Sequence, residues 1–384
     1  METKKKGFPV AFWVCACSEI FERLAYYLGR SLILIFVTAS VATGGLGLSD
    51  TVAANMQSNL TAFSYLLPLF GAVIVDKYIG ARYTTPVGMF IAAAGYFTGG
   101  IAKSATGVYV MIFLVSLGLA LFKNGAIIGR VITDKSQMDP AFSMRYTLVN
   151  VGAFIGTFLV GILYKDVFAK NGVLGFAPCF KMAALMMVLG GLWYIFVCWR
   201  FLGDLGKLPF KKTLTEEEKA AEAKKKEETG TKQPLTTIEK KRIGAIFVAS
   251  LFSIVFWIFW YLGYMPVYFY WAENMDWVVA GYQVPSTWFD AANSLFCVIL
   301  GPLTAALWKK LAARPQGDMS LFRKTGLGIA IIGVGYLFYA AIDIMRGGEK
   351  ASVLWLIVFA FLLTMGEMFF SPLGHSFISK YSPS

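Results

Sequence analysis

Six ionisable side chains stand in stretches of sequence that are otherwise apolar. They are three carboxylates and three cations: Glu19, Glu22, Glu367, Arg23, Arg30 and Lys123. One charge at the centre of a membrane helix costs about 2.5–3.5 kcal/mol on insertion scales, so six charges facing lipid would cost roughly 15–20 kcal/mol. That sum exceeds the stability of a typical protein, about 5–15 kcal/mol. We therefore expect these groups to face one another or a shared solvated cavity.

The spacing of the first four charges places them on one helix. Glu19 and Arg23 are four residues apart with the carboxylate on the N-terminal side, which predicts an ion pair between them. Arg30 follows two helical turns after Arg23 and projects from a similar face, with Tyr26 and Tyr27 between them. This helix is thus expected to present guanidinium, carboxylate and phenol groups to the cavity.

Such a cavity suits a ligand with two charged ends. Arginines bind a carboxylate with bidentate geometry, and Glu367 could bind an ammonium group. If the ligand draws Arg23 away from Glu19 or Glu22, the released carboxylate can take up a proton, as intramembrane carboxylates do in proton relays. The pattern therefore indicates binding of a zwitterion coupled to proton movement, although a purely structural ion-pair network is the alternative.

The elements that must position these groups are apolar segments of the length that crosses a membrane, about 20 residues. We count ten: roughly residues 10–41, 51–75, 83–103, 106–131, 141–164, 176–202, 243–271, 286–312, 323–346 and 352–380. With the N-terminus inside, 25 of the 35 Lys and Arg residues fall on the cytoplasmic side and five on the outer side. Because cytoplasmic loops are enriched in Lys and Arg, this bias predicts a multi-pass plasma or inner membrane protein with both termini in the cytoplasm.

The composition agrees with a membrane protein and argues against other classes. Hydrophobic residues make up 57% of the 384 residues and charged residues only 15%, so an ordinary soluble enzyme is not expected. The net charge of +12 is explained by the cytoplasmic loops, so we expect no nucleic-acid partner. The five cysteines and the single histidine form no ligand pattern, and no phosphate loop or catalytic triad is present, so we expect no metal, cofactor or enzyme activity.

A polar, highly charged stretch divides the chain. We expect an N-terminal bundle of six helices at 1–202, a flexible cytoplasmic linker at 203–242, and an incomplete C-terminal bundle of four helices at 243–384.

Several motifs along the chain resemble those of one family. Glu19-Ile-Phe-Glu22-Arg23-Leu-Ala-Tyr26-Tyr27 is similar to the ExxER signature of the proton-dependent oligopeptide transporter (POT) family of the major facilitator superfamily. Further resemblances lie in Gly71–Arg82, Leu121–Lys123, Tyr146–Gly152, Pro285–Asn293 and Gly366–Gly374. The ExxER motif and the Gly-Glu…Ser-Pro-x-Gly motif, in this order, are the most specific.

The resemblance implies an all-α major facilitator fold and the import of di- and tripeptides with protons by a monomer in the lipid bilayer. It implies that Glu19, Glu22 and Arg23 couple the proton and that Asp76 and Arg82 belong to a cytoplasmic gate. The implied substrate-binding residues are Arg23, Tyr26, Tyr27, Arg30, Lys123, Asn150, Asn293, Glu367 and Ser371.

Two departures from the family pattern keep other interpretations open. Tyr261 stands where the seventh helix of the family usually has a glutamate, and the chain ends after the tenth of twelve expected helices. We therefore interpret the chain as truncated. The alternatives are a related facilitator for another anionic solute, such as nitrate or an organic acid, and a fragment that does not transport.

Overall fold

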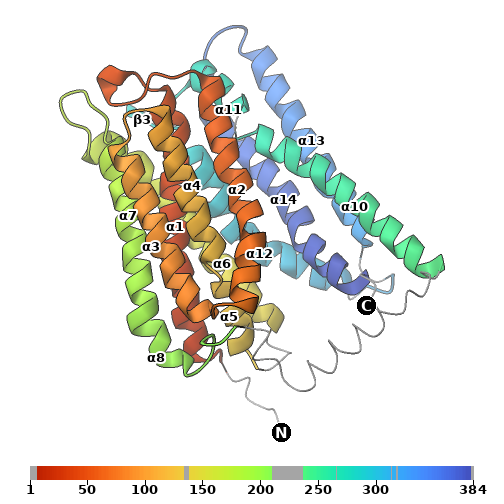
Figure 1. The fold of residues 1–384 in the computed structure, drawn as a ribbon. Coiled ribbons are helices and arrows are strands. Elements are labelled where there is room, and N and C mark those ends of the chain that lie inside the picture. The colour runs from red at the N-terminus through yellow and green to blue at the C-terminus, as the bar shows by residue number, and fades with distance from the viewer. Residues whose placement is uncertain are drawn as a thin grey trace. The chain divides into compact units, whose positions relative to one another are not determined.

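The computed structural model describes residues 7–133, 138–209, 237–264, 266–312, 314–316 and 319–381. The chain forms two compact units, Met1–Thr213 and Leu214–Ser384. Both are built mainly from helices, and helices lie in all ten of the predicted apolar ranges (Figure 1). The prediction of an all-α membrane fold is thereby confirmed.

The first unit contains long helices joined by short turns. Its helices are α1 (Val10–Thr38), α2 (Asp50–Lys77), α3 (Ala81–Ile101), α4 (Ala105–Leu121), α5 (Asn124–Val131), α6 (Met138–Ile162), α7 (Phe176–Trp193) and α8 (Trp199–Leu202), with the short turns η1 (Val41–Thr43), η3 (Leu163–Val167) and η4 (Tyr194–Cys198). Helix α1 packs against α2, α6 and α7, and α3 packs against α4 and α7. Helix α1, which carries four of the six unusual charges, is therefore surrounded by neighbours on several sides.

The predicted fourth membrane segment is a broken helix. Helix α4 ends at Leu121 and α5 begins at Asn124, and Lys123 between them has φ −117° and ψ 33°. A break inside a membrane helix is tolerated where the freed backbone groups find partners in the protein. Here the amide of Lys123 donates a hydrogen bond to Thr85 Oγ1 of α3 at 3.4 Å.

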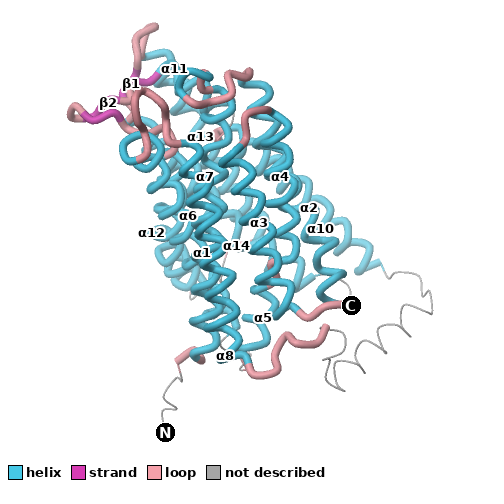
Figure 2. The backbone as a smooth tube through the Cα atoms, turned by 60° about the vertical axis from the view of Figure 1, so that its left-hand side comes forward, coloured by secondary structure: helices cyan, strands magenta, loops and turns pink. Residues whose placement is uncertain are grey.

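The second unit is held together by aromatic side chains. Its elements are α10 (Thr237–Leu262), α11 (Pro266–Asn274), β1 (Met275–Asp276), β2 (Val278–Val279), β3 (Tyr282–Gln283), α12 (Trp288–Ala312), α13 (Leu321–Met345), β4 (Ala351–Ser352) and α14 (Leu354–Tyr381). The rings of Phe256 and Phe370 stack with centroids 4.0 Å apart, which joins α10 to α14. Strands β1 and β4 pair in parallel and β2 and β3 form a hairpin, and Figure 2 shows β1 and β2 beside α11.

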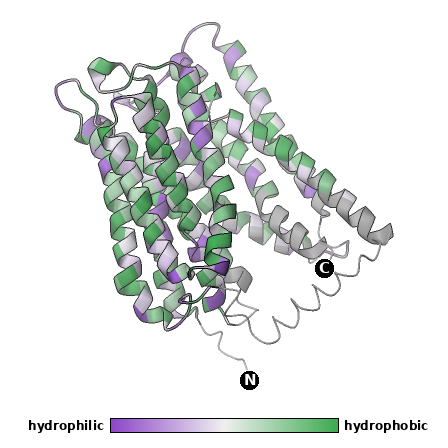
Figure 3. Ribbon diagram, viewed as in Figure 1, coloured by the Kyte–Doolittle hydropathy of each residue, from purple (hydrophilic) through white to green (hydrophobic). Residues whose placement is uncertain are grey.

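Hydrophobic residues run along most helices of the described part (Figure 3). Six helices there are long and apolar enough to cross a membrane: Asp50–Lys77, Ala105–Val131, Met144–Val167, Phe176–Leu202, Trp288–Trp308 and Phe322–Met345. The chain is a multi-pass membrane protein, and the number of ten membrane helices stays a prediction.

Two glycines allow α3 and α4 to pack backbone against backbone. A Cβ atom on Gly118 would lie 2.4 Å from the carbonyl oxygen of Gly88, and a Cβ on Gly88 would lie 2.4 Å from the carbonyl of Gly118. Small residues at helix interfaces are a general way to bind membrane helices closely, because van der Waals contact replaces the hydrophobic effect in lipid.

We predict that Gly118→Ala separates α3 from α4 and destabilises the first unit by about 1–3 kcal/mol, the usual effect of overpacking. Thermal unfolding of the purified protein in detergent measures this. Gly333→Ala in α13 is the control, because a Cβ there meets no atom within 4 Å. Equal melting temperatures for the two variants would contradict the prediction.

Candidate functional site

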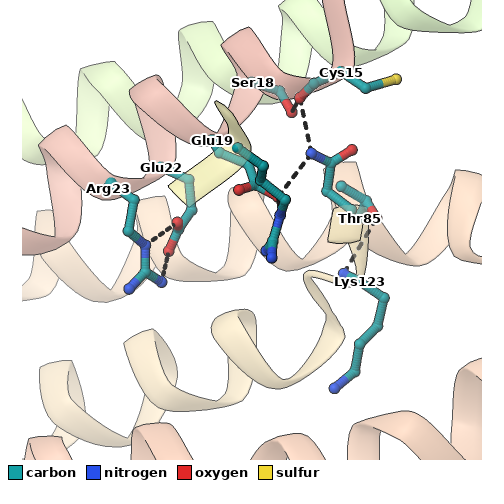
Figure 4. A network of polar contacts seen from close by, with 9 residues as sticks. Cys15, Ser18, Glu19, Glu22, Arg23, Thr85 and Lys123 are labelled. Carbon is teal, nitrogen blue, oxygen red and sulfur yellow. Dashed lines mark hydrogen bonds and ion pairs between the residues drawn. The ribbon is translucent and has the colours of Figure 1, made fainter. Parts of the chain in front are cut away.

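Glu22 and Arg23 form a bidentate ion pair on α1 (Figure 4). Arg23 Nε lies 2.5 Å from Glu22 Oε2, and Arg23 Nη2 lies 2.6 Å from Glu22 Oε1. The Glu22 side chain is 1% exposed and that of Arg23 is 27% exposed. The carboxylate is thus buried with both oxygens occupied, while the Arg23 side chain stays partly exposed.

Glu19 has its partners on other helices. Arg145 Nε of α6 lies 2.8 Å from Glu19 Oε1, and Asn124 Nδ2 of α5 donates to the same oxygen at 3.1 Å. Asn124 Nδ2 also donates to the carbonyl of Cys15 at 2.8 Å. These bonds join α1, α5 and α6 around one buried carboxylate.

The pairing of Glu19 with Arg23 predicted from their spacing is therefore wrong. Residues four apart on an isolated helix are neighbours, but here Glu19 turns toward α5 and α6, where Arg145 and Asn124 bind it. The long Arg23 side chain folds back onto the adjacent Glu22 instead.

The other charged and aromatic residues of α1 continue along the helix. Tyr26 and Tyr27 make an edge-to-face contact with centroids 5.3 Å apart. The Arg23 guanidinium lies 4.9 Å from the Tyr26 ring centroid, and the Arg30 guanidinium lies 5.7 Å from that of Tyr27. Cations and aromatic rings therefore alternate along α1, as the sequence indicated, and cation–π attraction contributes to holding the two guanidiniums.

Lys123 reaches a different helix from the ion pairs. Its Nζ donates to the carbonyl of Pro68 in α2 at 2.8 Å, and the Asp76 carboxylate acts on it electrostatically. Asn150 of α6 donates its amide to the Tyr146 carbonyl, one turn earlier, at 3.0 Å. The structure thus places both predicted binding residues in the first unit, with their polar groups bonded to backbone carbonyls.

Arg82, predicted at a cytoplasmic gate, connects α3 to α8. It donates to the carbonyl of Trp199 at 3.0 Å and to that of Gly203, and its guanidinium lies 5.2 Å from the Trp199 ring centroid. In turn the Trp199 indole donates to the Arg82 carbonyl at 3.2 Å. In this structure Arg82 joins α3 to the residues at and after α8. Asp76 lies in the last turn of α2.

The second unit holds a buried carboxylate among neutral donors. Asn293 Nδ2 of α12 donates to Glu367 Oε2 at 3.0 Å and to Thr364 Oγ1 at 2.9 Å, both in α14. Glu367 is 7% exposed. The buried Trp260 indole lies beside it. The side chain of Ser371 lies outside the described part of the chain.

Tyr261, which stands where the family pattern usually has a glutamate, belongs to an aromatic cluster in α10. Its ring contacts Trp260 edge to face at 5.0 Å and lies 6.0 Å from Trp257. A phenol is therefore packed where the family pattern usually has an ionisable carboxylate.

Sequence reasoning missed four residues of these clusters: Arg145, Asn124, Thr364 and Trp260. Arg145 carried a usable signal, since it is a charge at the start of an apolar segment. The other three are neutral residues within apolar segments, and their roles depend on which helices pack together.

We predict that Arg82→Ala destabilises the first unit by about 2–4 kcal/mol, because two backbone carbonyls lose a charged donor. Lys207→Ala is the matched control at the same end, since Lys207 pairs with an Asp204 side chain that is 94% exposed. Exposed pairs contribute about 0–1 kcal/mol. Thermal unfolding in detergent compares the two variants, and a Lys207→Ala effect as large as that of Arg82→Ala would contradict the prediction.

Comparisons with known proteins agree with these features. A family model described as the POT family matches residues 205–384. The uncharacterized transporter YclF of Bacillus subtilis (strain 168) is 24% identical, covering 98% of this chain and 83% of that protein. The di-/tripeptide transporter of Lactococcus lactis subsp. cremoris is 24% identical, covering 98% and 84%.

The fold has solved counterparts. The crystal structure of peptide transporter POT in complex with sulfate aligns with a TM-score of 0.86 and 23% identity, covering 100% of this chain and 85% of that one. The part of this chain that the structure describes thus has the helical fold of that transporter. The resemblance to the POT family that the motifs indicated is confirmed by the family match at residues 205–384 and by the similar di-/tripeptide transporter.

Proposed function

We propose that this chain is a symporter that imports di- and tripeptides together with protons by alternating access. The observation that carries the proposal is the different chemistry of the two units. The first unit presents partly exposed guanidiniums at Arg23 and Arg145, and the second holds a buried carboxylate at Glu367.

A peptide has the charges that these two clusters would bind. Its carboxylate matches Arg23, which keeps 27% of its side chain exposed although it is paired. Its ammonium matches Glu367, whose described partner is the neutral amide of Asn293. The Lactococcus lactis relative is named a di-/tripeptide transporter, which supports the same substrate class.

Proton coupling follows from the ion pair on α1. When a substrate carboxylate takes the Arg23 guanidinium, Glu22 loses the donors of both its oxygens. A buried carboxylate without a counter-ion is strongly disfavoured, so it takes up a proton from the outside. The proton therefore enters together with the substrate.

We assign the residue roles accordingly. Glu19, Glu22 and Arg23 couple the proton, and Asp76 and Arg82 belong to the cytoplasmic end that opens and closes. The substrate-binding residues are Arg23, Tyr26, Tyr27, Arg30, Lys123, Asn150, Asn293, Glu367 and Ser371. The chain would act by alternating access as a monomer in the plasma or inner membrane with a cytoplasmic N-terminus.

We predict that proteoliposomes containing the chain take up a labelled dipeptide faster when the outside is acidic. Glu367→Gln should raise the KM for the dipeptide about 10–100-fold, the equivalent of a lost charged hydrogen bond. It should also remove the preference for a free over an N-acetylated amino terminus.

The matched control is Glu349→Gln, which removes an exposed carboxylate in the same unit. The same uptake assay also distinguishes peptides from the alternative solutes. Uptake of nitrate or an organic acid without competition from unlabelled dipeptides would contradict peptide transport.

A further inference from the structure

Arg145 is a charged residue that joins two helices of the first unit. It lies on α6, its side chain is 32% exposed, and its Nε lies 2.8 Å from Oε1 of Glu19, which is 1% exposed. The pair crosses the contact between α1 and α6, which pack along much of their length. Breaking this ion pair would therefore alter the contact between α1 and α6.

A glycine on a third helix makes room for the Arg145 guanidinium. A Cβ atom added to Gly125 of α5 would lie 2.9 Å from Arg145 Nη2 and 3.0 Å from Arg145 Cζ. Because these distances are shorter than ordinary van der Waals contact, a larger residue at 125 would displace the guanidinium. The Arg145 guanidinium thus occupies the space that a side chain at position 125 would fill.

The charges that act on Glu19 come from two elements. Arg145 approaches from α6 and Glu22 from α1 itself, while Asn124 of α5 contributes a neutral amide. Arg23, the other nearby cation on α1, has two nitrogens committed to Glu22. Among the described residues Arg145 is therefore the cation that balances Glu19.

The second oxygen of Glu19 is available for a proton. Glu19 Oε2 is buried and has no hydrogen-bond partner in the described part of the chain. Glu19 thus has one oxygen bound to Arg145 and Asn124 and one oxygen without a described partner. Its counter-ion, Arg145, has about a third of its side chain exposed.

We propose that Arg145 is a second switch between proton and substrate in this transporter. In the empty state its guanidinium pairs with Glu19. When a substrate carboxylate is bound, the guanidinium, which stays protonated, transfers from Glu19 to that carboxylate, and Glu19 takes one proton from the outer solution. The inference rests on the proposed function, and it gives this chain a coupling pair between α1 and α6 in addition to the Glu22–Arg23 pair within α1.

The test is the pH profile of dipeptide uptake in proteoliposomes. In Arg145→Gln, Glu19 has lost its counter-ion and holds its proton over the whole range, so uptake should depend less steeply on outside pH. The KM should rise about tenfold, the equivalent of one lost charged contact to the substrate carboxylate. Arg145→Lys, which keeps the charge, should restore most of the pH dependence.

Two glycine variants test the geometry without changing any charge. Gly125→Ala should displace the guanidinium and flatten the pH profile as Arg145→Gln does. Gly129→Ala, one turn further along α5, is the matched control, because a Cβ there meets Phe142 at an ordinary 3.5 Å. Wild-type pH profiles in both Arg145→Gln and Gly125→Ala would overturn the proposal, as would equal effects of the two glycine variants.

A measurement without substrate separates this inference from the proposed function. Infrared titration of the purified protein follows protonation of buried carboxyl groups, and the band absent from Glu19→Gln reports Glu19. This band should persist to higher pH in Arg145→Gln than in the wild type, and an unshifted band would overturn the assignment of Arg145 as counter-ion. Failure of the wild type to take up dipeptides would instead contradict peptide transport and leave this titration as the test of Arg145.

Discussion

The burial of ionised carboxylates in a membrane helix is the constraint on which the first unit depends. Glu19 and Glu22 are each 1% exposed, and burying either carboxylate without a partner would strongly destabilise the folded protein. Glu22 finds its partner next to it on α1, and Glu19 finds one on α6. The pairing of Glu19 with a residue of α6 requires α1, α5 and α6 to pack together at the level of Glu19. The need of Glu19 for a counter-ion therefore constrains how these helices pack.

The packing of the first unit meets this requirement with small residues and interrupted helices. Gly125 leaves the space through which Arg145 reaches Glu19, and Gly88 and Gly118 let α3 and α4 approach. The break at Lys123 separates α4 from α5 and allows the lysine to bond to the Pro68 carbonyl on α2. These features hold polar groups at defined positions and satisfy backbone groups within the protein.

The second unit buries the carboxylate of Glu367 without a cation paired to it among the described residues. Glu367 accepts a hydrogen bond from the Asn293 amide, which also donates to Thr364, and an aromatic core joins α10 to α14. A neutral donor stabilises a carboxylate less than a guanidinium does, so Glu367 differs in its environment from Glu19 and Glu22.

The sequence alone determined where the helices lie and which residues bring unusual charge into them. Hydropathy and charge are local properties, so the sequence showed the ranges of the apolar segments, the presence of Arg23, Tyr26, Tyr27 and Arg30 on one helix, and the carboxylate of Glu367 within an apolar segment. Which residues pair with one another could not be predicted from the sequence. Spacing on a single helix favoured Glu19 with Arg23, yet the side chain at position 145 binds Glu19 because tertiary packing brings α6 against α1. A carboxylate pairs with the cation nearest in space, and nearness across helices more than a hundred residues apart is decided only when the bundle closes.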